Sequence, residues 1–210
     1  MTFASAERAR LSDLLLENGP DAPTLCEGWT TRDMATHLWV RENRPDAAAG
    51  MMVGPLKAHL GKVSDQAKSR DYRELVQSWA KGPGTLNPMR LADKHVNAAE
   101  HFIHLEDVRR GEVARGGELP APRAFSERDT DALYRSLRRM APMLLRSSTV
   151  PVVLQAPGRA PVTVAREAVA VHTPVTVSGE VGELLLWAHG RDAVHVTVAG
   201  DLAAVKRARL

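Results

Sequence analysis

Apolar residues in the first two thirds of the chain recur at the three- and four-residue spacing of helix faces, which predicts a mainly helical N-terminal part. One helix is predicted from about Ser5 to Glu17, ending at the Asn-Gly-Pro terminator of residues 18–20. A second helix is predicted to begin at Thr30, an N-cap residue with Asp33 three positions later. In that helix His37 falls on the inward, apolar stripe.

Three further helices follow in the sequence pattern. Residues 45–61 are interrupted by Gly and Pro, and after them a short helix capped by Asp71 is predicted to end at Gly82. The next predicted helix opens at Pro88 and runs to Arg110, and another starts after Ser126. These helices predict an antiparallel helical bundle.

The composition changes near residue 147, where short β-branched runs bounded by Pro and Gly replace the Leu/Ala/Arg-rich segments. Strands are predicted at residues 150–154, 162–165, 175–177 and 193–198, and one helix at 182–189. In the last strand the alternation predicts Val194, Val196 and Val198 inward, with His195 and Thr197 outward. We therefore expect an α+β protein with a helical domain over residues 1–147 and a small α/β domain over 148–210.

Composition places the chain among ordinary globular proteins. Its 210 residues are 44% hydrophobic, with no apolar run near the roughly 18 residues of a membrane span, and the N-terminus has no signal-peptide pattern. We therefore expect a cytoplasmic protein without a membrane partner. The single cysteine, Cys26, excludes an intrachain disulfide and a site with several thiolates, so metal chemistry would have to use histidines and carboxylates.

The net charge of +3 is spread along the chain and identifies no partner. The arginines of residues 135–146 fall at near-helical spacing among Leu and Met, which favours a solvated helix face over a nucleic-acid patch. Aromatic residues make up only 4% of the chain, few for stacking on bases. We expect no nucleic-acid partner.

One helix stripe carries unusual chemistry. In the predicted helix 88–110, Val96, Glu100, Ile103, His104 and Asp107 share one face, and three of the five are ionisable. Burying unpaired carboxylates is costly, so something must compensate them. Glu100 and His104 lie one turn apart and could converge on an ion, with His37 as third ligand. Two histidines and a glutamate leave an open position, as in catalytic zinc sites.

The same residues also allow plainer interpretations. A Glu–His pair one turn apart occurs by chance on solvated helices, and His37 could be a hydrogen-bonded core histidine. His101 and His104 form a competing pair, although His101 points away from the stripe. Cys26 lies in the loop before the capped helix and is interpreted as a small buried apolar residue, because no regular element places a histidine beside it.

Two segments carry a family resemblance. Residues 25–38 read LCEGWTTRDMATHL, and residues 100–107 read EHFIHLED. Together they resemble the metal-binding domain of mycothiol-dependent maleylpyruvate isomerases, a DinB-like four-helix bundle. The tail at 179–191 is similar to the small sterol-carrier-like α/β domain behind such bundles. The resemblance covers nearly the whole chain, and residues 97–110 look closer to an actinobacterial subgroup than to the isomerase itself.

The resemblance implies His37, Glu100 and His104 as metal ligands, in agreement with the stripe. It maps a family arginine implicated in the isomerase chemistry onto Arg191, where a plain helix-ending Gly-Arg turn is the alternative. Arg41, one turn after His37, could bind an anionic substrate or pair with Asp107, which would lie behind the ligands.

Three functions remain open at this stage. The first is a mycothiol-dependent isomerase or transferase, in which a divalent ion, zinc before nickel or manganese, activates a thiol or water toward a small electrophile. The second is a metal-dependent hydrolase. The third is a non-catalytic binding protein that the metal staples and whose C-terminal domain holds an apolar ligand. We expect a monomer or a homodimer with small-molecule partners.

Overall fold

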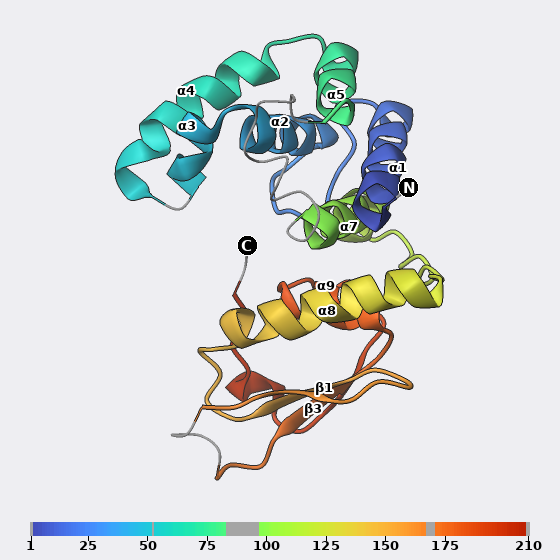
Figure 1. Cartoon of the computed structure of the whole chain (residues 1–210). Coiled ribbons are helices and arrows are strands. Elements are labelled where there is room, and N and C mark those ends of the chain that lie inside the picture. The colour runs from blue at the N-terminus through green and yellow to red at the C-terminus, as the bar shows by residue number, and fades with distance from the viewer. Residues whose placement is uncertain (1, 52, 83–96, 167–170, 209–210) are drawn as a thin grey trace. The chain divides into compact units, whose positions relative to one another are not determined.

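The computed structural model describes residues 2–51, 53–82, 97–166 and 171–208, which form helices and a small sheet (Figure 1). The chain is divided into two compact units, unit 1 over Met1–Glu118 and unit 2 over Leu119–Leu210. The α+β class predicted from the sequence is confirmed. None of the described helices is both long and apolar enough to span a bilayer.

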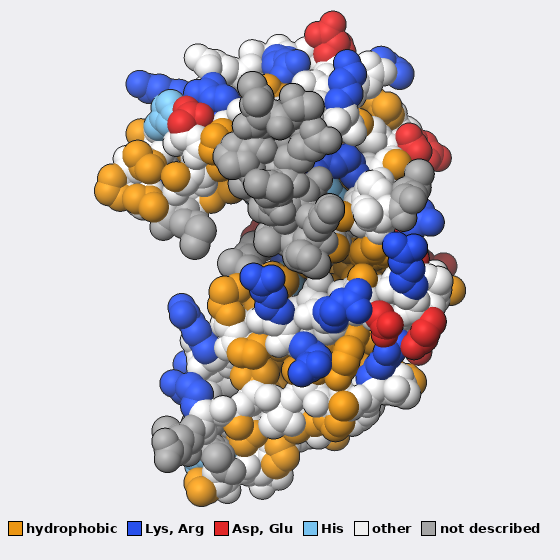
Figure 2. Space-filling model, in the orientation of Figure 1, with side chains coloured by type: hydrophobic (Ala, Val, Ile, Leu, Met, Phe, Trp, Pro, Cys, Tyr) orange, Lys and Arg blue, Asp and Glu red, His pale blue; other side chains and the backbone are white. Residues whose placement is uncertain are grey.

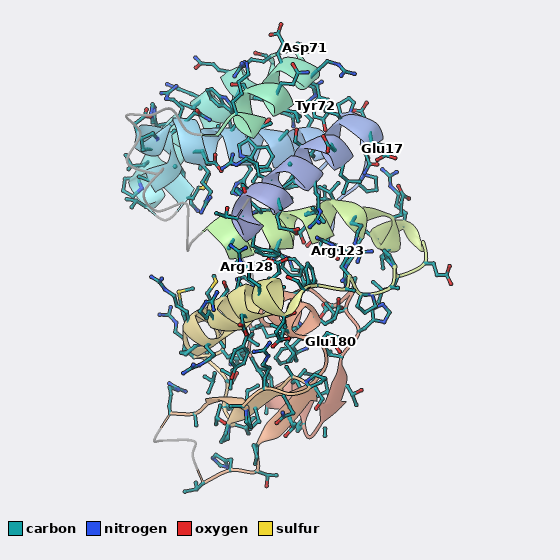
Figure 3. The ribbon with its side chains drawn as sticks, turned by 45° about the vertical axis from the view of Figure 1, so that its right-hand side comes forward. Glu17, Asp71, Tyr72, Arg123, Arg128 and Glu180 are labelled. Atoms are coloured by element: carbon teal, nitrogen blue, oxygen red, sulfur yellow. The ribbon has the colours of Figure 1, made fainter. Side chains whose placement is uncertain are left out.

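The regular elements among the described residues of unit 1 are helices, joined by loops. Its helices are α1 (Phe3–Asn18), α2 (Thr31–Asn43), α3 (Pro45–Ala48), α4 (Lys57–Lys68), α5 (Tyr72–Ala80) and α7 (Asn97–Arg109). Helix α1 packs on α5 and α7, and α2 packs on α4 and α5. Fully buried Leu11, Leu38 and Trp79 stand in the core between them. Tyr72, labelled in Figure 3, joins α5 to α1 by donating its hydroxyl proton to the Leu15 carbonyl at 2.8 Å.

The predicted helix starts are confirmed where a side chain caps them. The Thr30 hydroxyl accepts from the Asp33 amide, and the Asp33 carboxylate accepts from the Thr30 amide at 3.0 Å, a complete capping box. Asp71 caps α5 by accepting from the Glu74 amide, and Ser126 caps the helix that begins at Glu127 by accepting from the Asp129 amide. Helix α4 was not predicted, because its N-cap residue, Leu56, makes no capping bond and leaves no signal in the sequence. The predicted start at Pro88, and Val96, lie outside the described residues.

Unit 2 contains a four-stranded sheet among its described residues, in the order β2-β1-β3-β4. The strands are β1 (Val152–Gln155), β2 (Val162–Val164), β3 (Val175–Ser178) and β4 (Thr197–Ala199). Strand β1 runs antiparallel to β2 and parallel to β3, and β3 runs antiparallel to β4. Figure 1 shows helices α8 (Glu127–Leu144) and α9 (Val181–Ala188) on the same side of this sheet. Every residue of α9 is buried, because α8 packs against it.

Two sequence expectations are corrected in unit 2. Helix α8 was assigned to the helical domain ending at residue 147, but it packs on α9 and β2 and belongs to unit 2. Its apolar face, including Leu133 and Leu137, is buried in that packing. The last strand, Thr197–Ala199, begins four residues later than the predicted 193–198 and ends one residue beyond it, and ahead of it the His195 amide donates to the Glu183 carboxylate at 2.7 Å.

The arginines of α8 lie where the sequence predicts. Arg135, Arg138 and Arg139 of α8 are exposed, as is Arg146 just beyond its end, and Figure 2 shows basic side chains along this helix. Leu133, Leu137 and Leu144 of α8 are buried. These arginines therefore form a solvated helix face, as expected for an amphipathic helix on a small domain.

Candidate metal centre

Helices α2 and α7 of unit 1 supply the candidate site. The capping box at Thr30 fixes where α2 begins, and His37 follows about two turns later. Helix α7 contributes Glu100, His104 and Asp107 from a single face. The ring centroids of His37 and His104 lie 5.3 Å apart in an edge-to-face arrangement. The stripe predicted on α7 and the inward histidine of α2 therefore meet.

His37 presents a buried nitrogen that no described residue satisfies. Its ring lies 5.2 Å from that of Trp29, and its Nε2 atom is inaccessible to solvent and has no hydrogen-bond partner in the described part of the chain. Burial, and then the nearby charge of His104, lower the pKa of His37 to about 3. At neutral pH the ring is uncharged and offers a lone pair, which is the form that binds metals. An unsatisfied buried nitrogen is costly unless a ligand engages it.

Glu100 lies between two cationic partners. Its Oε1 is 3.6 Å from His104 Nε2, and its Oε2 is 2.9 Å from Arg41 Nη2. Burial alone would raise the pKa of this carboxyl, but the hydrogen bond and charge of His104, together with Arg41, lower the pKa to about 2. Glu100 is therefore an ionised carboxylate at neutral pH and can serve as an oxygen ligand.

His104 is held from behind by Asp107. The His104 Nδ1 atom lies 3.1 Å from Asp107 Oδ2, and the Cys26 thiol donates to the same oxygen at 3.4 Å. Although burial opposes a charge on the ring, hydrogen bonding with Asp107, Cys26 and Glu100 raises the pKa of His104 well above its ordinary value. A carboxylate behind a histidine fixes which nitrogen carries the proton, and this arrangement commonly orients metal-ligating histidines.

These residues fit a divalent cation. One donor atom from each of His37, Glu100 and His104 lies within 4.8 Å of the other two. The Nε2 of His37 is buried and unsatisfied, and two imidazoles with one carboxylate suit zinc, nickel or manganese. The three positions predicted from the sequence are therefore brought together by the fold.

The two arginines predicted for the site lie in different units. Arg41 Nη2 lies 2.9 Å from Glu100 Oε2, an ion pair that the sequence did not suggest. The pairing fits the helix geometry, because Arg41 lies one turn beyond His37 on α2 and Glu100 lies in the first turn of α7. Arg191 belongs to unit 2, where its guanidinium is buried and donates to the His189 carbonyl at 2.8 Å.

His101 points away from the site, as its position on α7 predicts. It is fully buried, and its Nδ1 donates to the Ala4 carbonyl at 3.0 Å, while its Nε2 lies 3.3 Å from Glu42 Oε1. His59 contacts Asp46 at 2.8 Å on the exposed side of unit 1. Neither histidine shares a donor group with the candidate site within the described residues.

Cys26 is the site residue that sequence reasoning missed. It lies 81 positions from Asp107 in the chain, so no helical or strand spacing links the two. The loop is brought to α7 by its backbone, because the Leu25 amide donates to the Asp107 carbonyl at 2.9 Å. The prediction of Cys26 as a small buried apolar residue is confirmed in part, because the side chain packs, partly buried, against the apolar core, and its thiol also contacts the carboxylate that supports His104.

Comparison with known proteins gives a fold likeness. No family model matches the chain, and no curated protein matches it in sequence. Two solved structures of a mycothiol-dependent maleylpyruvate isomerase are similar in fold, each at 17% identity, covering 98% of this chain and 94% of theirs. The TM-score is 0.59 for a histidine-to-alanine mutant of that enzyme and 0.52 for the other crystal structure. At this identity the likeness establishes the fold.

Proposed function

We propose that this chain is a metal-dependent enzyme that uses a low-molecular-weight thiol, mycothiol, in an isomerisation or thiol-transfer reaction. The observation that carries the proposal is the buried, unsatisfied Nε2 of His37, a residue that has a donor atom within 4.8 Å of donors of Glu100 and His104. The fold likeness to a mycothiol-dependent isomerase supports the choice of thiol. The attribution of unit 1 to DinB-like bundles and of unit 2 to sterol-carrier-like domains belongs to the same proposal.

In this function His37, Glu100 and His104 hold the ion, with zinc the first choice. A divalent ion with an open position supplies Lewis acidity, which lowers the pKa of a bound thiol or water. Asp107 holds the Nδ1 proton of His104, so that the Nε2 lone pair is directed to the ligand group. Arg41 neutralises Glu100 from its other oxygen and is the candidate partner for a substrate carboxylate.

Arg191 is retained as the candidate catalytic residue on the strength of the family resemblance. Its bond to the His189 carbonyl supports an alternative, structural role in unit 2. The test proposed for the thiol therefore includes this residue, and a variant that lowers activity without altering unit 2 would favour the catalytic role.

Metal content tests the ligand assignment. We expect purified protein to hold about one divalent ion per chain, and His37→Ala or His104→Ala to lose most of it, because each removes one of three ligands. His101→Ala is the matched control, a histidine on the same helix that faces α1 and α2. Elemental analysis of the dialysed proteins measures the result. Retention of the ion by both ligand variants would show that the site is wrongly assigned.

Binding of the thiol tests the reaction class. We expect mycothiol to perturb the visible spectrum of the Co²⁺-substituted protein through a sulfur-to-cobalt bond, and to have no effect on metal-free protein. Arg41→Ala and Arg191→Ala should weaken this binding while metal content stays unchanged, if these residues bind the thiol's polar groups. A spectrum that ignores the thiol, in a protein that hydrolyses esters or amides, would replace the proposal with the hydrolase.

A further inference from the structure

The His104 ring has a group of donor atoms at each of its two nitrogens. On the Nε2 side lie Glu100 Oε1, at 3.6 Å, and His37. On the Nδ1 side lies Asp107 Oδ2, at 3.1 Å, and that oxygen is 3.4 Å from Cys26 Sγ. The donor atoms of Cys26, His104 and Asp107 all lie within 4.8 Å of one another, as do those of the first group.

We propose that Cys26, His104 Nδ1 and Asp107 form a second cation position, for a thiophilic divalent ion such as Cd²⁺ or Zn²⁺. A thiolate, an imidazole and a carboxylate form a donor set that such ions accept. A tetrahedral ion with bonds of about 2.0–2.3 Å keeps its ligand atoms roughly 3.3–3.8 Å apart. The two recorded separations, 3.1 and 3.4 Å, are already close to this range, so binding requires little rearrangement.

The ion takes the place of protons that now connect these three side chains. The Cys26 thiol donates its proton to Asp107, and the Nδ1–H of His104 donates to the same oxygen. When the cation binds, the thiol proton leaves to solvent, the ring proton passes from Nδ1 to Nε2, and sulfur, nitrogen and oxygen form bonds to the ion. The fully buried Asp107 carboxylate exchanges two hydrogen-bond donors for the ion, so it has a partner in both states.

An ion at the second position and an ion held by His104 in the candidate metal centre exclude each other. A neutral imidazole has one lone pair and carries a proton on its other nitrogen. When Nδ1 binds an ion, the remaining proton sits on Nε2 and points to Glu100, so His104 can no longer ligate beside His37. Two ions on one ring would also repel each other across about 6 Å of buried protein. A thiophilic ion therefore removes His104 from the candidate metal centre.

This inference shares only His104 with the proposed function and can be tested separately. The sequence contains a single cysteine, so any cysteine-to-metal signal reports on Cys26. Metal-free protein is titrated with Cd²⁺ while the ultraviolet sulfur-to-cadmium charge-transfer absorption is recorded. We expect the absorption to rise until one equivalent is bound. Its absence in the wild-type protein overturns the second position.

Variants then locate the sulfur. Cys26→Ser, nearly equal in size, should abolish the absorption, and Asp107→Asn should weaken Cd²⁺ binding by about 100-fold. His37→Ala is the matched control, because it removes a ligand of the first group only, and it should leave the absorption and its titration unchanged. If His37→Ala removes the absorption as completely as Cys26→Ser does, the sulfur binds an ion in the first group and the second position does not exist.

Two further measurements keep the result interpretable. Cys26 is partly exposed, so iodoacetamide should alkylate it in the metal-free wild-type protein. One equivalent of Cd²⁺ should protect it from alkylation. If Cd²⁺ leaves the alkylation rate unchanged, the proposal is overturned, even where Cys26→Ser fails to fold. Mn²⁺ prefers oxygen and imidazole ligands, so it tests the first group, which contains His37, Glu100 and His104. Its binding is measured as the loss of the electron paramagnetic resonance signal of free Mn²⁺. A zinc content that His37→Ala leaves unchanged, with an intact cadmium signal, would reject the ligand assignment of the proposed function and leave the second position standing.

Discussion

Two histidines three positions apart on α7 have different tasks because their rings contact different partners. His104 faces His37 and the donor group, whereas His101 is buried with Glu42 and Arg8. Arg8 donates to both oxygens of Glu42, at 2.7 and 2.9 Å, and joins α1 to α2. Arg8 and His101 both bind Glu42, so this second group of charges stabilises unit 1 and shares no side chain with the proposed metal ligands.

The buried group of Arg8, Glu42 and His101 predicts that the stability of unit 1 falls in acid. Burial raises the pKa of Glu42, but hydrogen bonds to His101 and Arg8 outweigh it and the net pKa is lowered from 4.5. A lowered folded-state pKa means that the ionised carboxylate stabilises the fold above pH 4.5 and that this contribution is lost as pH falls through the folded pKa. Glu42→Gln should therefore lower the free energy of unfolding by about 3–5 kcal/mol at pH 7, and the stability of the variant should depend less on pH in the acid range.

Urea unfolding from pH 7 to pH 3 measures this effect. Glu17→Gln is the control, since Glu17 is exposed near the end of α1 and is labelled in Figure 3. We expect the control to keep the wild-type slope of stability against pH. An equally steep acid dependence in Glu42→Gln would show that other carboxylates govern acid unfolding.

At the scale of elements, the loop between α1 and α2 holds the site together. Its Thr24 amide donates to the Trp29 carbonyl at 3.2 Å, and its Leu25 amide donates to the Asp107 carbonyl at 2.9 Å. The turn after α7 packs against the same loop through Gly111, where a Cβ atom would lie 2.0 Å from the Pro23 carbonyl oxygen. The loop that carries Cys26 therefore depends on close backbone contact with the end of α7.

Gly111→Ala should disrupt this contact. The added methyl group meets backbone atoms, which cannot move aside as a flexible side chain could. We therefore expect the free energy of unfolding to fall by about 1–3 kcal/mol. Gly61→Ala is the matched control, because Gly61 lies in α4 with nothing within 4 Å of the added atom and should gain up to about 1 kcal/mol. Chemical denaturation of both variants measures the difference. Equal stability of the two would contradict the tight contact at Gly111.

At the scale of the whole molecule, the chain has two units with separate cores. Every proposed metal ligand lies in unit 1, whereas unit 2 is built from α8, α9 and the sheet. A metal that binds folded unit 1 and not its unfolded chain stabilises that unit by mass action, by about 2.7 kcal/mol at a free concentration 100 times Kd. The effect on unit 2 should be absent or indirect.

Removal of the metal should therefore act on one unit. We expect chelation to lower the Tm of unit 1 and to increase hydrogen exchange at the amides of α2 and α7, while the amides of α9 and β3 keep their protection. Calorimetry with exchange measured by mass spectrometry gives both readouts. Collapse of unit 1 on chelation would favour a structural staple, a modest shift would favour an open site, and no change would reject a buried ion.

The sequence by itself determined the features that depend on residues close together in the chain. The capping box of Thr30 and Asp33 and the stripe of Glu100, His104 and Asp107 repeat at fixed helical spacings, so they can be identified before any fold is known. The same spacing gave the inward direction of His37. The α+β class followed from the shift between two periodicities near residue 147.

Only the tertiary structure decided which distant segments meet. The contact of Cys26 with Asp107, the pairing of Arg41 with Glu100 and the packing of α8 on α9 join residues far apart in the chain. An amphipathic helix such as α8 requires an apolar partner, but its pattern does not specify which one, so the domain boundary at 147 was misplaced. Local hydrogen bonds have a fixed spacing, whereas long-range packing is chosen by the whole set of surfaces that fold together.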